Sequence, residues 1–223
     1  MSSNRGLKRG RPPQTPEEAQ RVRGQIVIAA GEVFADYGSH ATSVTLIIKQ
    51  AGISRPTFYR YFANASEPLH VLLSESDESL VNSIRTASLG ATEGVDLAIR
   101  VIDAYLDWAR ARGPILRPLF AELYDPSSPV YEHRTRAISM LRSIFVDRMV
   151  ELGRPAPDPL DLDALLNACE FVVYRIARDG QPDAETTARA RLTMVRIALA
   201  TLGLPDDLER ALAVPGLFVS TEE

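Results

Sequence analysis

Apolar residues recur along the chain at intervals of three and four, which is the spacing of an amphipathic helix. In residues 26–37 they form one continuous helical face made of Ile26, Ala29, Ala30, Val33, Phe34 and Tyr37. Gly38 follows directly and is a suitable residue for the end of such a helix. No stretch of the sequence shows the strict alternation of apolar and polar residues that a half-buried strand requires. The pattern therefore predicts an all-α protein.

Two shorter helices are expected next, and both begin at hydroxyl side chains. Thr42 and Ser43 are suitable N-caps for a helix whose inner face is formed by Val44, Ile47, Ile48 and Ala51. Ser54 can cap a third helix, whose buried side carries Phe58 and Phe62. A capping oxygen accepts a hydrogen bond from a backbone N–H group of the first turn, so these positions predict two helix starts.

Beyond residue 62 the expected helices are longer and are separated by clusters of glycine and proline. Breaks are expected near residue 90 and at residues 112–118, 125–129, 153–159, 180–182 and 203–205. The segments 160–177 and 184–202 carry apolar residues on more than one face. A helix of this kind tends to be covered on two sides, so the pair predicts a subunit interface. Val195 and Leu199 are trial positions for disrupting it.

Charge divides the chain into two unlike parts. The 223 residues are 45% hydrophobic and 24% charged, as in an average folded globular protein, and the net charge is −4. Residues 1–62 contain nine lysines and arginines against four acids, so the remaining residues carry a net charge of −9. A basic N-terminal quarter on an acidic body indicates that the first part binds a polyanion.

Other features narrow the class of protein. The longest apolar run is residues 26–30, far below the roughly 20 residues needed to cross a bilayer. The single cysteine, Cys169, allows no intramolecular disulfide, and His40, His70 and His133 lack the spacing of metal ligands. We therefore expect a cytoplasmic protein with no membrane segment, no metal and no other cofactor.

The first three helices have the layout of a helix-turn-helix, with a turn at residues 51–54 joining the last two. In this motif the second helix crosses the DNA backbone and the third enters the major groove. The candidate contacts are hydroxyls at the start of the second helix and polar groups at both ends of the third: Thr42, Ser43, Arg55, Thr57, Tyr59, Arg60 and Tyr61. If the three helices merely began an α-bundle, the same groups would be solvated.

Residues 26–62 resemble the N-terminal domain of the tetracycline-repressor (TetR) family of bacterial transcription regulators. The matching positions are Ala29, Ala30, Phe34, Gly38, Thr42, Val44, Ile47, Ala51, Gly52, Ile53, Ser54, Tyr59 and Phe62. The remainder resembles the family only in its length and helical layout. The resemblance implies a homodimeric repressor that a small-molecule effector releases from a palindromic site on double-stranded DNA. It implies a flexible basic arm at residues 1–20, a helix-turn-helix domain at 21–66 and a helical ligand-binding and dimerisation domain at 67–223.

Two positions depart from the family pattern. Ile48 stands where family members usually have alanine, which predicts shifted packing of the second helix. After Phe62 the lysine that commonly caps the next helix and touches phosphate is missing. Asn64 or Ser66 could cap that helix instead, without adding charge.

The basic tail resembles an AT-hook, in which an Arg-Gly-Arg segment lies along a narrow minor groove. The segment is residues 8–13, and Arg9 and Arg11 are its candidate minor-groove residues. Narrow grooves of A·T-rich DNA concentrate negative potential and attract arginine. A tail of this composition can also act only as a solvated electrostatic arm.

In the TetR family the central helices enclose an inducer pocket, and aromatic residues of this chain are expected to line it. Tyr105 and Trp108 are three residues apart, and Phe120 and Tyr124 are four apart, so each pair can present rings on one helix face. The candidate ligand-binding residues are Tyr105, Trp108, Arg117, Phe120, Tyr124, Phe145 and Tyr174. They predict an apolar aromatic or lipid-like effector. An inward-pointing Arg117 would favour an anionic or carbonyl-bearing ligand, whereas an outward-pointing one would be solvated.

Three alternatives remain open at the level of the sequence. The protein could be an activator, or a regulator without a small-molecule ligand. From a different class, the acidic body could be a helical enzyme with a basic head. No phosphate-binding glycine loop, nucleophile elbow or metal-binding histidine pair supports catalysis, so we expect a non-enzyme with no catalytic residues.

Overall fold

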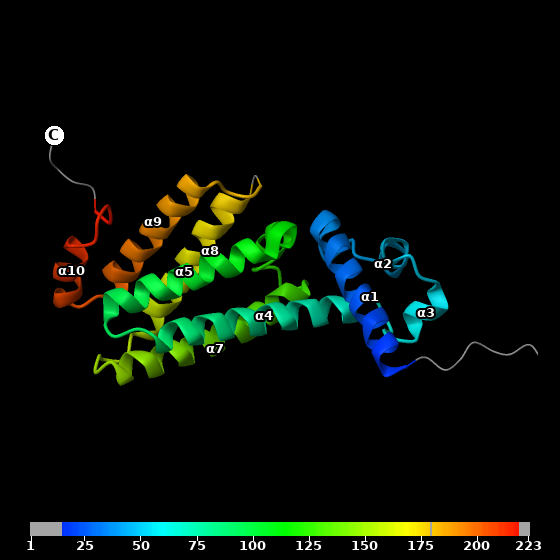
Figure 1. Ribbon diagram of the computed structural model, residues 1–223, viewed down its shortest axis with the longest axis horizontal. Coiled ribbons are helices and arrows are strands. Elements are labelled where there is room, and N and C mark those ends of the chain that lie inside the picture. The colour runs from blue at the N-terminus through cyan, green and yellow to red at the C-terminus, as the bar shows by residue number, and fades with distance from the viewer. Residues whose placement is uncertain (1–14, 179, 219–223) are drawn as a thin grey trace, which may run out of the picture.

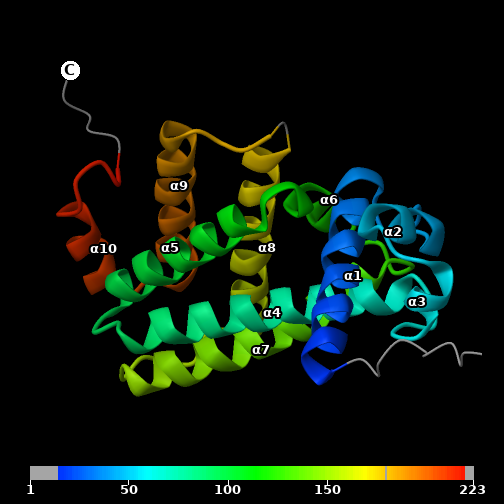
Figure 2. The ribbon, with the colours of Figure 1, turned by 45° about the vertical axis from the view of Figure 1, so that its right-hand side comes forward.

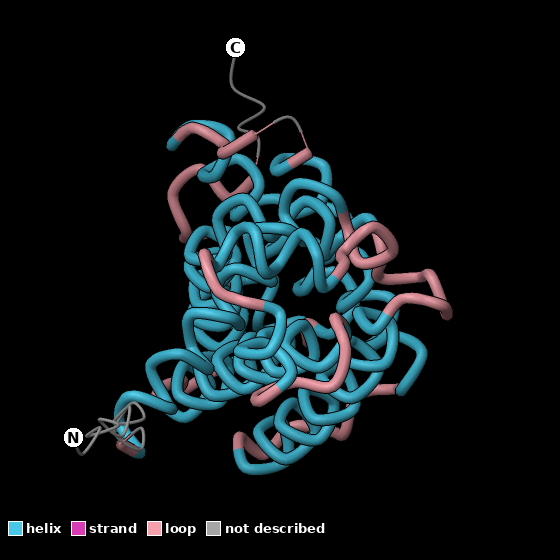
Figure 3. The backbone as a smooth tube through the Cα atoms, turned by 90° about the vertical axis from the view of Figure 1, so that its right-hand side faces the viewer, coloured by secondary structure: helices cyan, strands magenta, loops and turns pink. Residues whose placement is uncertain are grey.

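The computed structural model describes residues 15–178 and 180–218, and this part of the chain is helical without any strand (Figure 3). The all-α prediction is confirmed. The helices are α1 (Pro16–Tyr37), α2 (Val44–Ala51), α3 (Arg55–Tyr59), α4 (Ser66–Leu89), α5 (Gly94–Arg112), the 3-10 helix η1 (Gly113–Ile115), α6 (Leu116–Ala121), α7 (Pro129–Glu151), α8 (Pro159–Ala177), α9 (Ala184–Leu202) and α10 (Pro205–Leu212).

The molecule is elongated, with α1, α2 and α3 gathered at one end (Figure 1). Helix α4 leads away from this end, and α5 and α7 run alongside it. Helices α8 and α9 pack against each other and cross the body steeply, and α10 lies at the far end (Figure 2). In the described residues no helix is both long enough and apolar enough to span a membrane.

Local capping explains the N-terminal helices. Ser43 accepts a hydrogen bond from the backbone N–H of Leu46, and Ser54 accepts one from the N–H of Thr57, which confirms both as N-caps. Thr42 does not cap α2, because its hydroxyl donates to the carbonyl of Gly38 at 2.8 Å. Helix α2 ends at Gly52, whose φ of 63° lies in the left-handed region that favours glycine.

Helix α1 begins earlier than the sequence pattern indicates. Thr15 and Glu18 form a reciprocal capping box at its start, so residues 16–20 are helical rather than part of a flexible arm. At the other end the buried face stops at Phe34, and Tyr37 is 58% exposed. Residues 1–14 lie outside the described residues, and with them the predicted AT-hook and its Arg9 and Arg11.

The N-terminal core is small and well enclosed. Ile26, Ala30, Ile47 and Phe58 are completely buried in it, and Phe62, which follows α3 in the chain, also packs into it. The unusual Ile48 is only partly buried at the edge of this cluster. The isoleucine side chain therefore packs on the edge of this cluster, where the alanine of the family pattern would leave more of the cluster exposed.

Helix α4 begins without the lysine that the family pattern suggests. The side-chain oxygen of Asn64 accepts hydrogen bonds from the backbone N–H groups of Ser66, at 2.9 Å, and Glu67, at 3.1 Å. The expectation that Asn64 or Ser66 caps this helix is thus met by Asn64. The cap adds no positive charge at this point of the domain.

The expected helix breaks are found, except that the last three residues of the break expected at 112–118 already belong to α6. Pro118 was expected in a break but lies inside α6, in its first turn. The first N–H groups of a helix have no intrahelical acceptor, so a proline there removes no hydrogen bond.

The two long C-terminal helices pack on each other and on the body. In α9, Val195 and Leu199 are only 1% and 4% exposed within a single chain, so both face the chain's own core. They are therefore the wrong positions for disrupting a subunit interface. The exposed apolar side chains of α8 are Leu160 and Phe171, the latter 63% exposed.

Candidate DNA-binding face and effector cavity

The start of α3 presents an organised polar surface. Arg55 is exposed, and its guanidinium donates to the hydroxyl of Thr45 on α2 at 3.1 Å. The hydroxyls of Ser54 and Thr57 are 2.8 Å apart and hydrogen bond to each other. These contacts tie the first turn of α3 to its own cap and to α2, so Arg55 and Thr57 project from a fixed point.

The remaining predicted contacts lie on the same end of the molecule (Figure 2). Tyr59 is 49% exposed, and its ring meets Phe58 edge to face at 5.5 Å. Arg60 is exposed, while Tyr61, Thr42 and Ser43 are partly buried. The described members of the predicted DNA-contacting set thus lie in α3 or directly before α2 and after α3, at one end of the molecule.

Sequence reasoning missed two candidates on α2. Thr45 and Lys49 are exposed, one turn apart, on the side opposite the buried Ile47 and Ala51. Their spacing of four against the apolar face was the signal that could have found them. Lys49 supplies a positive charge in the last turn of this helix.

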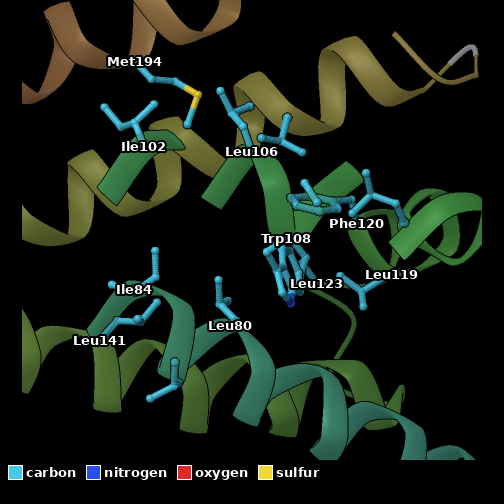
Figure 4. Close-up of a cluster of buried hydrophobic side chains, with 14 of the residues drawn as sticks. Leu80, Ile84, Ile102, Leu106, Trp108, Leu119, Phe120, Leu123, Leu141 and Met194 are labelled. Carbon is cyan, nitrogen blue, oxygen red and sulfur yellow. The ribbon is translucent and has the colours of Figure 1, made fainter. Parts of the chain in front are cut away.

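A cavity of about 150 Å³ lies inside the body, between α4, α5, α7, α8 and α9. Its wall is overwhelmingly aliphatic. Figure 4 shows some of these side chains within the surrounding hydrophobic cluster: Leu80 and Ile84 of α4 lie on one side and Ile102 of α5 on the other, with Trp108 and Phe120 at one end. An enclosed apolar cavity with a few polar groups is the usual form of a small-molecule site.

Four of the predicted ligand residues line this cavity: Tyr105, Trp108, Phe120 and Phe145. The Trp108 ring stacks on Tyr105 with 5.8 Å between centroids and 11° between planes. Its indole N–H donates to the carbonyl of Ser76 at 3.1 Å, which fixes the ring in place.

The other three predicted ligand residues are not on the cavity wall. Arg117 is exposed to solvent. Tyr124 is 61% exposed because α6 ends at Ala121, so the spacing of four from Phe120 no longer places both rings on one helix face. Tyr174 is partly buried elsewhere in the core.

A polar cluster missed by sequence reasoning closes the cavity between α7 and α8. Arg134 donates to both carboxylate oxygens of Glu170, at 3.0 Å from Nε and 2.7 Å from Nη2. Burial opposes the charged guanidinium, but the hydrogen bonds to Glu170 and the attraction of its negative charge together raise the pKa of Arg134. Tyr124 covers this pair, with the Arg134 guanidinium 4.5 Å from its ring centroid.

A second cluster joins α4 to α7. One ring nitrogen of His133 lies 2.9 Å from the Asp77 carboxylate, and the other lies 3.0 Å from a ring nitrogen of His70. Burial raises the pKa of Asp77, and the hydrogen bond with His133 partly opposes this. His133 and Asp77 line the cavity, whereas His70 does not. Among the described residues, no group of three or more His, Cys, Asp and Glu is arranged to hold a metal ion.

A third polar contact marks the distal end of the cavity. Arg154 donates to both oxygens of Asp207, at 3.0 and 2.5 Å, and to the carbonyl of Leu202 at 3.1 Å. Burial opposes ionisation of Asp207, but the hydrogen bonds from Arg154 and from the backbone N–H of Leu204, together with the positive charge of Arg154, lower the pKa of that carboxyl. A side chain at Gly94 would collide with this pair, so glycine is needed there.

Hydrogen bonds connect the cavity region to the N-terminal domain. The Glu122 carboxylate, next to α6, accepts from the backbone N–H of Ser39 at 2.9 Å and from the hydroxyls of Ser39 and Ser128 at 2.5 Å. His40 and Asp125 form a second contact at 2.7 Å. Leu119 and Phe120 of α6 line the cavity. One short segment of the chain therefore contributes both to the cavity wall and to the contact of Glu122 with the N-terminal domain.

Comparisons with known proteins identify the family. Residues 26–66 match the model for "Bacterial regulatory proteins, tetR family". The HTH-type transcriptional regulator TtgR of Pseudomonas putida is 30% identical over 207 residues, which cover 88% of this chain and 87% of TtgR. The chain belongs to the TetR family. The HTH-type transcriptional activator FasR of Mycolicibacterium smegmatis is 31% identical over 102 residues, about half of each chain, at 46% and 47%.

Solved structures of TetR-family regulators share this fold. The fatty acid degradation regulator FadR from Bacillus halodurans has a TM-score of 0.67 at 22% identity, over 81% of this chain and 96% of FadR. SmeT, the repressor of the Stenotrophomonas maltophilia multidrug efflux pump SmeDEF, has a TM-score of 0.62 at 20% identity, over 92% and 96%. This TetR-family chain is a DNA-binding transcriptional regulator with an N-terminal helix-turn-helix and a helical C-terminal region.

Proposed function

We propose that this regulator is a homodimeric repressor that an apolar small molecule releases from a palindromic operator. The observation that carries the proposal is the largely apolar cavity of about 150 Å³, whose wall includes α6. The same segment is hydrogen bonded to the N-terminal domain through Glu122. A displacement of α6 by a ligand in the cavity can therefore be transmitted to the DNA-binding helices over a short distance.

The DNA-reading role belongs to α3 and to the start of α2. Arg55 and Thr57 meet base edges in the major groove, because they project from the first turn of α3. The hydroxyls of Thr42, Ser43, Tyr59 and Tyr61 and the guanidinium of Arg60 contact the phosphate backbone, which positions the domain without reading sequence. Arg9 and Arg11 add a minor-groove contact, and this remains a prediction from sequence alone.

The domain boundaries follow the packing. Residues up to 66 hold one hydrophobic cluster around Ile26, Ile47 and Phe58, and the helices from residue 67 onward enclose a separate, larger cluster. Phe34 of α1 packs into the larger cluster, so the two units share a contact surface. We assign DNA binding to residues 15–66 and effector binding and dimerisation to residues 67–218.

Dimerisation is assigned to the outer faces of α8 and α9. Leu160 and Phe171 leave large apolar surfaces exposed on α8, which a partner copy would cover. A two-fold dimer through these helices presents two identical DNA-binding heads, as a palindromic operator requires.

Release follows from competition between two conformations. An effector can shift the equilibrium only if it binds one conformation more tightly than the other. Filling the cavity displaces Leu119 and Phe120, and Glu122 passes the displacement to Ser39 at the end of α1. The spacing of the two heads then no longer fits the operator.

The test uses the sole tryptophan, which lines the cavity. The operator duplex is first found by gel shift with DNA flanking the gene. Compounds are then screened for quenching of Trp108 fluorescence and, in parallel, for release of this duplex from the protein. We expect compounds that do both at the same concentration. A compound that quenches Trp108 tightly but leaves DNA affinity unchanged would contradict effector-driven release.

Activation is a second candidate function, because the related FasR is named an activator. A reporter driven by the operator distinguishes the two: deletion of the gene raises expression under repression and lowers it under activation. In either case we place the protein in the cytoplasm with chromosomal DNA. We assign it no catalytic activity, since the family to which it belongs consists of transcription regulators.

A further inference from the structure

The charged groups on the cavity wall are already neutralised by one another. Arg134 is paired with Glu170, and Arg154 is paired with Asp207. Both pairs are at least four-fifths buried, so the partners have little solvent to replace a lost contact. Removing one partner from a buried pair leaves an uncompensated charge, which is strongly destabilising.

The histidine on the wall is likewise occupied. Both ring nitrogens of His133 are engaged, one by Asp77 and the other by His70. An incoming anion would therefore have to break this chain or one of the two arginine pairs to gain a cationic partner.

Tyr105 is different from these groups. No hydrogen bond of its hydroxyl is found among the residues that the structure describes, and the partly buried side chain lines the cavity. Burial raises the pKa of Tyr105 well above its usual value, so the hydroxyl remains a neutral donor. A hydroxyl on the cavity wall that makes no hydrogen bond within the protein is free to donate to an acceptor on a ligand.

The surroundings of Tyr105 also disfavour a charged ligand. The thiol of Cys169 lines the same part of the wall, and burial raises its pKa to about 12, so it stays neutral. The Glu170 carboxylate is near enough to raise the pKa of Tyr105 further. A ligand carboxylate placed at this hydroxyl would find no unpaired cation, because the nearby Arg134 is already held by Glu170.

The shape of the cavity wall indicates the shape of the rest of the ligand. On α5 the lining runs from Gly94 to Trp108, which spans about 21 Å along the helix axis. Aliphatic side chains from α4 and α7 face this row along its length. The space is therefore long and apolar, and the Tyr105 hydroxyl is a polar group on its wall that makes no hydrogen bond to the described residues.

We infer that the effector is an uncharged, elongated aliphatic molecule with a single hydroxyl, ester or ketone oxygen that accepts the hydrogen bond of Tyr105. This inference rests on the proposed effector role of the cavity and names the ligand class. It excludes free carboxylates of the same chain length.

The test compares three probes with the same chain on the full-length protein at pH 8: 1-decanol, methyl decanoate and decanoate. Binding is followed by Trp108 quenching and by calorimetry. We expect 1-decanol and methyl decanoate to bind at least tenfold more tightly than decanoate. Lengthening the alcohol by one methylene should tighten binding about three- to fourfold until the cavity is full.

Tyr105→Phe keeps the ring that stacks on Trp108 and removes only the hydroxyl. It should weaken binding of 1-decanol and methyl decanoate about three- to tenfold and leave decanoate unchanged. Tyr131→Phe is the matched control, because Tyr131 is exposed on α7 and does not line the cavity. Its affinities should equal those of the wild type.

The outcomes separate the ligand class from the release mechanism. Equal or tighter binding of decanoate, an unchanged Tyr105→Phe, or no binding of any probe overturns the inference. If decanoate is the tight ligand and also releases DNA, the proposed function stands without the inference. If 1-decanol binds through Tyr105 but does not alter DNA affinity, the ligand class stands and release fails.

Discussion

Arg55 and Tyr59 lie four residues apart on α3, and both are exposed. Tyr59→Phe removes a phosphate donor and should weaken binding to every duplex alike, since phosphate contacts carry no sequence information. Arg55→Ala should weaken operator binding and also reduce discrimination against other sequences. We expect about 1–3 kcal/mol for each change, measured by titration of operator and scrambled duplexes.

Tyr37→Phe is a matched control for these variants, because Tyr37 is an exposed tyrosine on α1 outside the proposed DNA face. Its affinity for both duplexes should be that of the wild type. Unchanged operator affinity in both Arg55→Ala and Tyr59→Phe would show that α3 does not enter the groove.

The contact between His40 and Asp125 should make the link between the two domains depend on pH. The hydrogen bond to Asp125 raises the pKa of His40 above 6.5, and hydrogen bonds from Ser127 and His40 lower the pKa of Asp125 from 3.8 to about 2. The histidine contribution is complete below pH 6.5 and is lost as pH rises through its raised pKa. The aspartate contribution is complete above pH 3.8 and is lost as pH falls towards 2. The contact is therefore strongest between these limits.

Asp125→Asn should return the pKa of His40 towards its ordinary value, which an NMR titration of the His40 ring measures directly. The same variant should flatten the pH dependence of domain coupling above pH 6.5. His70 is a useful internal reference, since it is distant in sequence and bonded to His133 instead. A His40 titration unaffected by Asp125→Asn would mean that the contact does not form in solution.

At the scale of elements, α6 is both cavity wall and neighbour of the N-terminal domain. Glu122→Gln replaces an acceptor of three hydrogen bonds by a group with one acceptor oxygen and an amide donor. We expect the free energy of unfolding to fall by about 1–3 kcal/mol. Effector-induced loss of operator affinity should shrink, while Trp108 quenching by the effector persists.

Glu132→Gln serves as the control for this change, because Glu132 pairs only with Arg136 on the exposed face of α7. A surface pair of this kind contributes little, so stability and coupling should remain close to those of the wild type. If Glu122→Gln releases DNA as fully as the wild type does, coupling runs through another route, such as α4.

At the scale of the whole molecule, the exposed face of α8 should be an interface. Phe171→Arg places a charge where a partner copy would bury an aromatic ring, so we expect monomers and loss of operator binding, measured by sedimentation and gel shift. Leu212→Arg is the control, since Leu212 is equally exposed but lies on α10. A wild-type monomer at micromolar concentration would refute the dimer.

The local parts of the fold were predictable from sequence. Ser43, Gly52, Ser54 and Asn64 begin or end helices through contacts within four residues, so their types and positions are sufficient evidence. The TetR resemblance of residues 26–62 rests on the same short-range pattern. The helix-turn-helix, and with it the DNA-binding function, could therefore be identified without a structure.

The composition of the cavity could not be predicted in the same way. Periodicity gives the direction of a side chain around its own helix, but not the element that covers that face. Only tertiary packing buried Val195, exposed Tyr124 and paired His133 with Asp77 and His70, which are 56 and 63 residues away. The sequence by itself determined the helices and the DNA-reading motif, because these depend on neighbours within one turn. The structure alone decided which residues meet inside the body, because those contacts depend on how the helices cross.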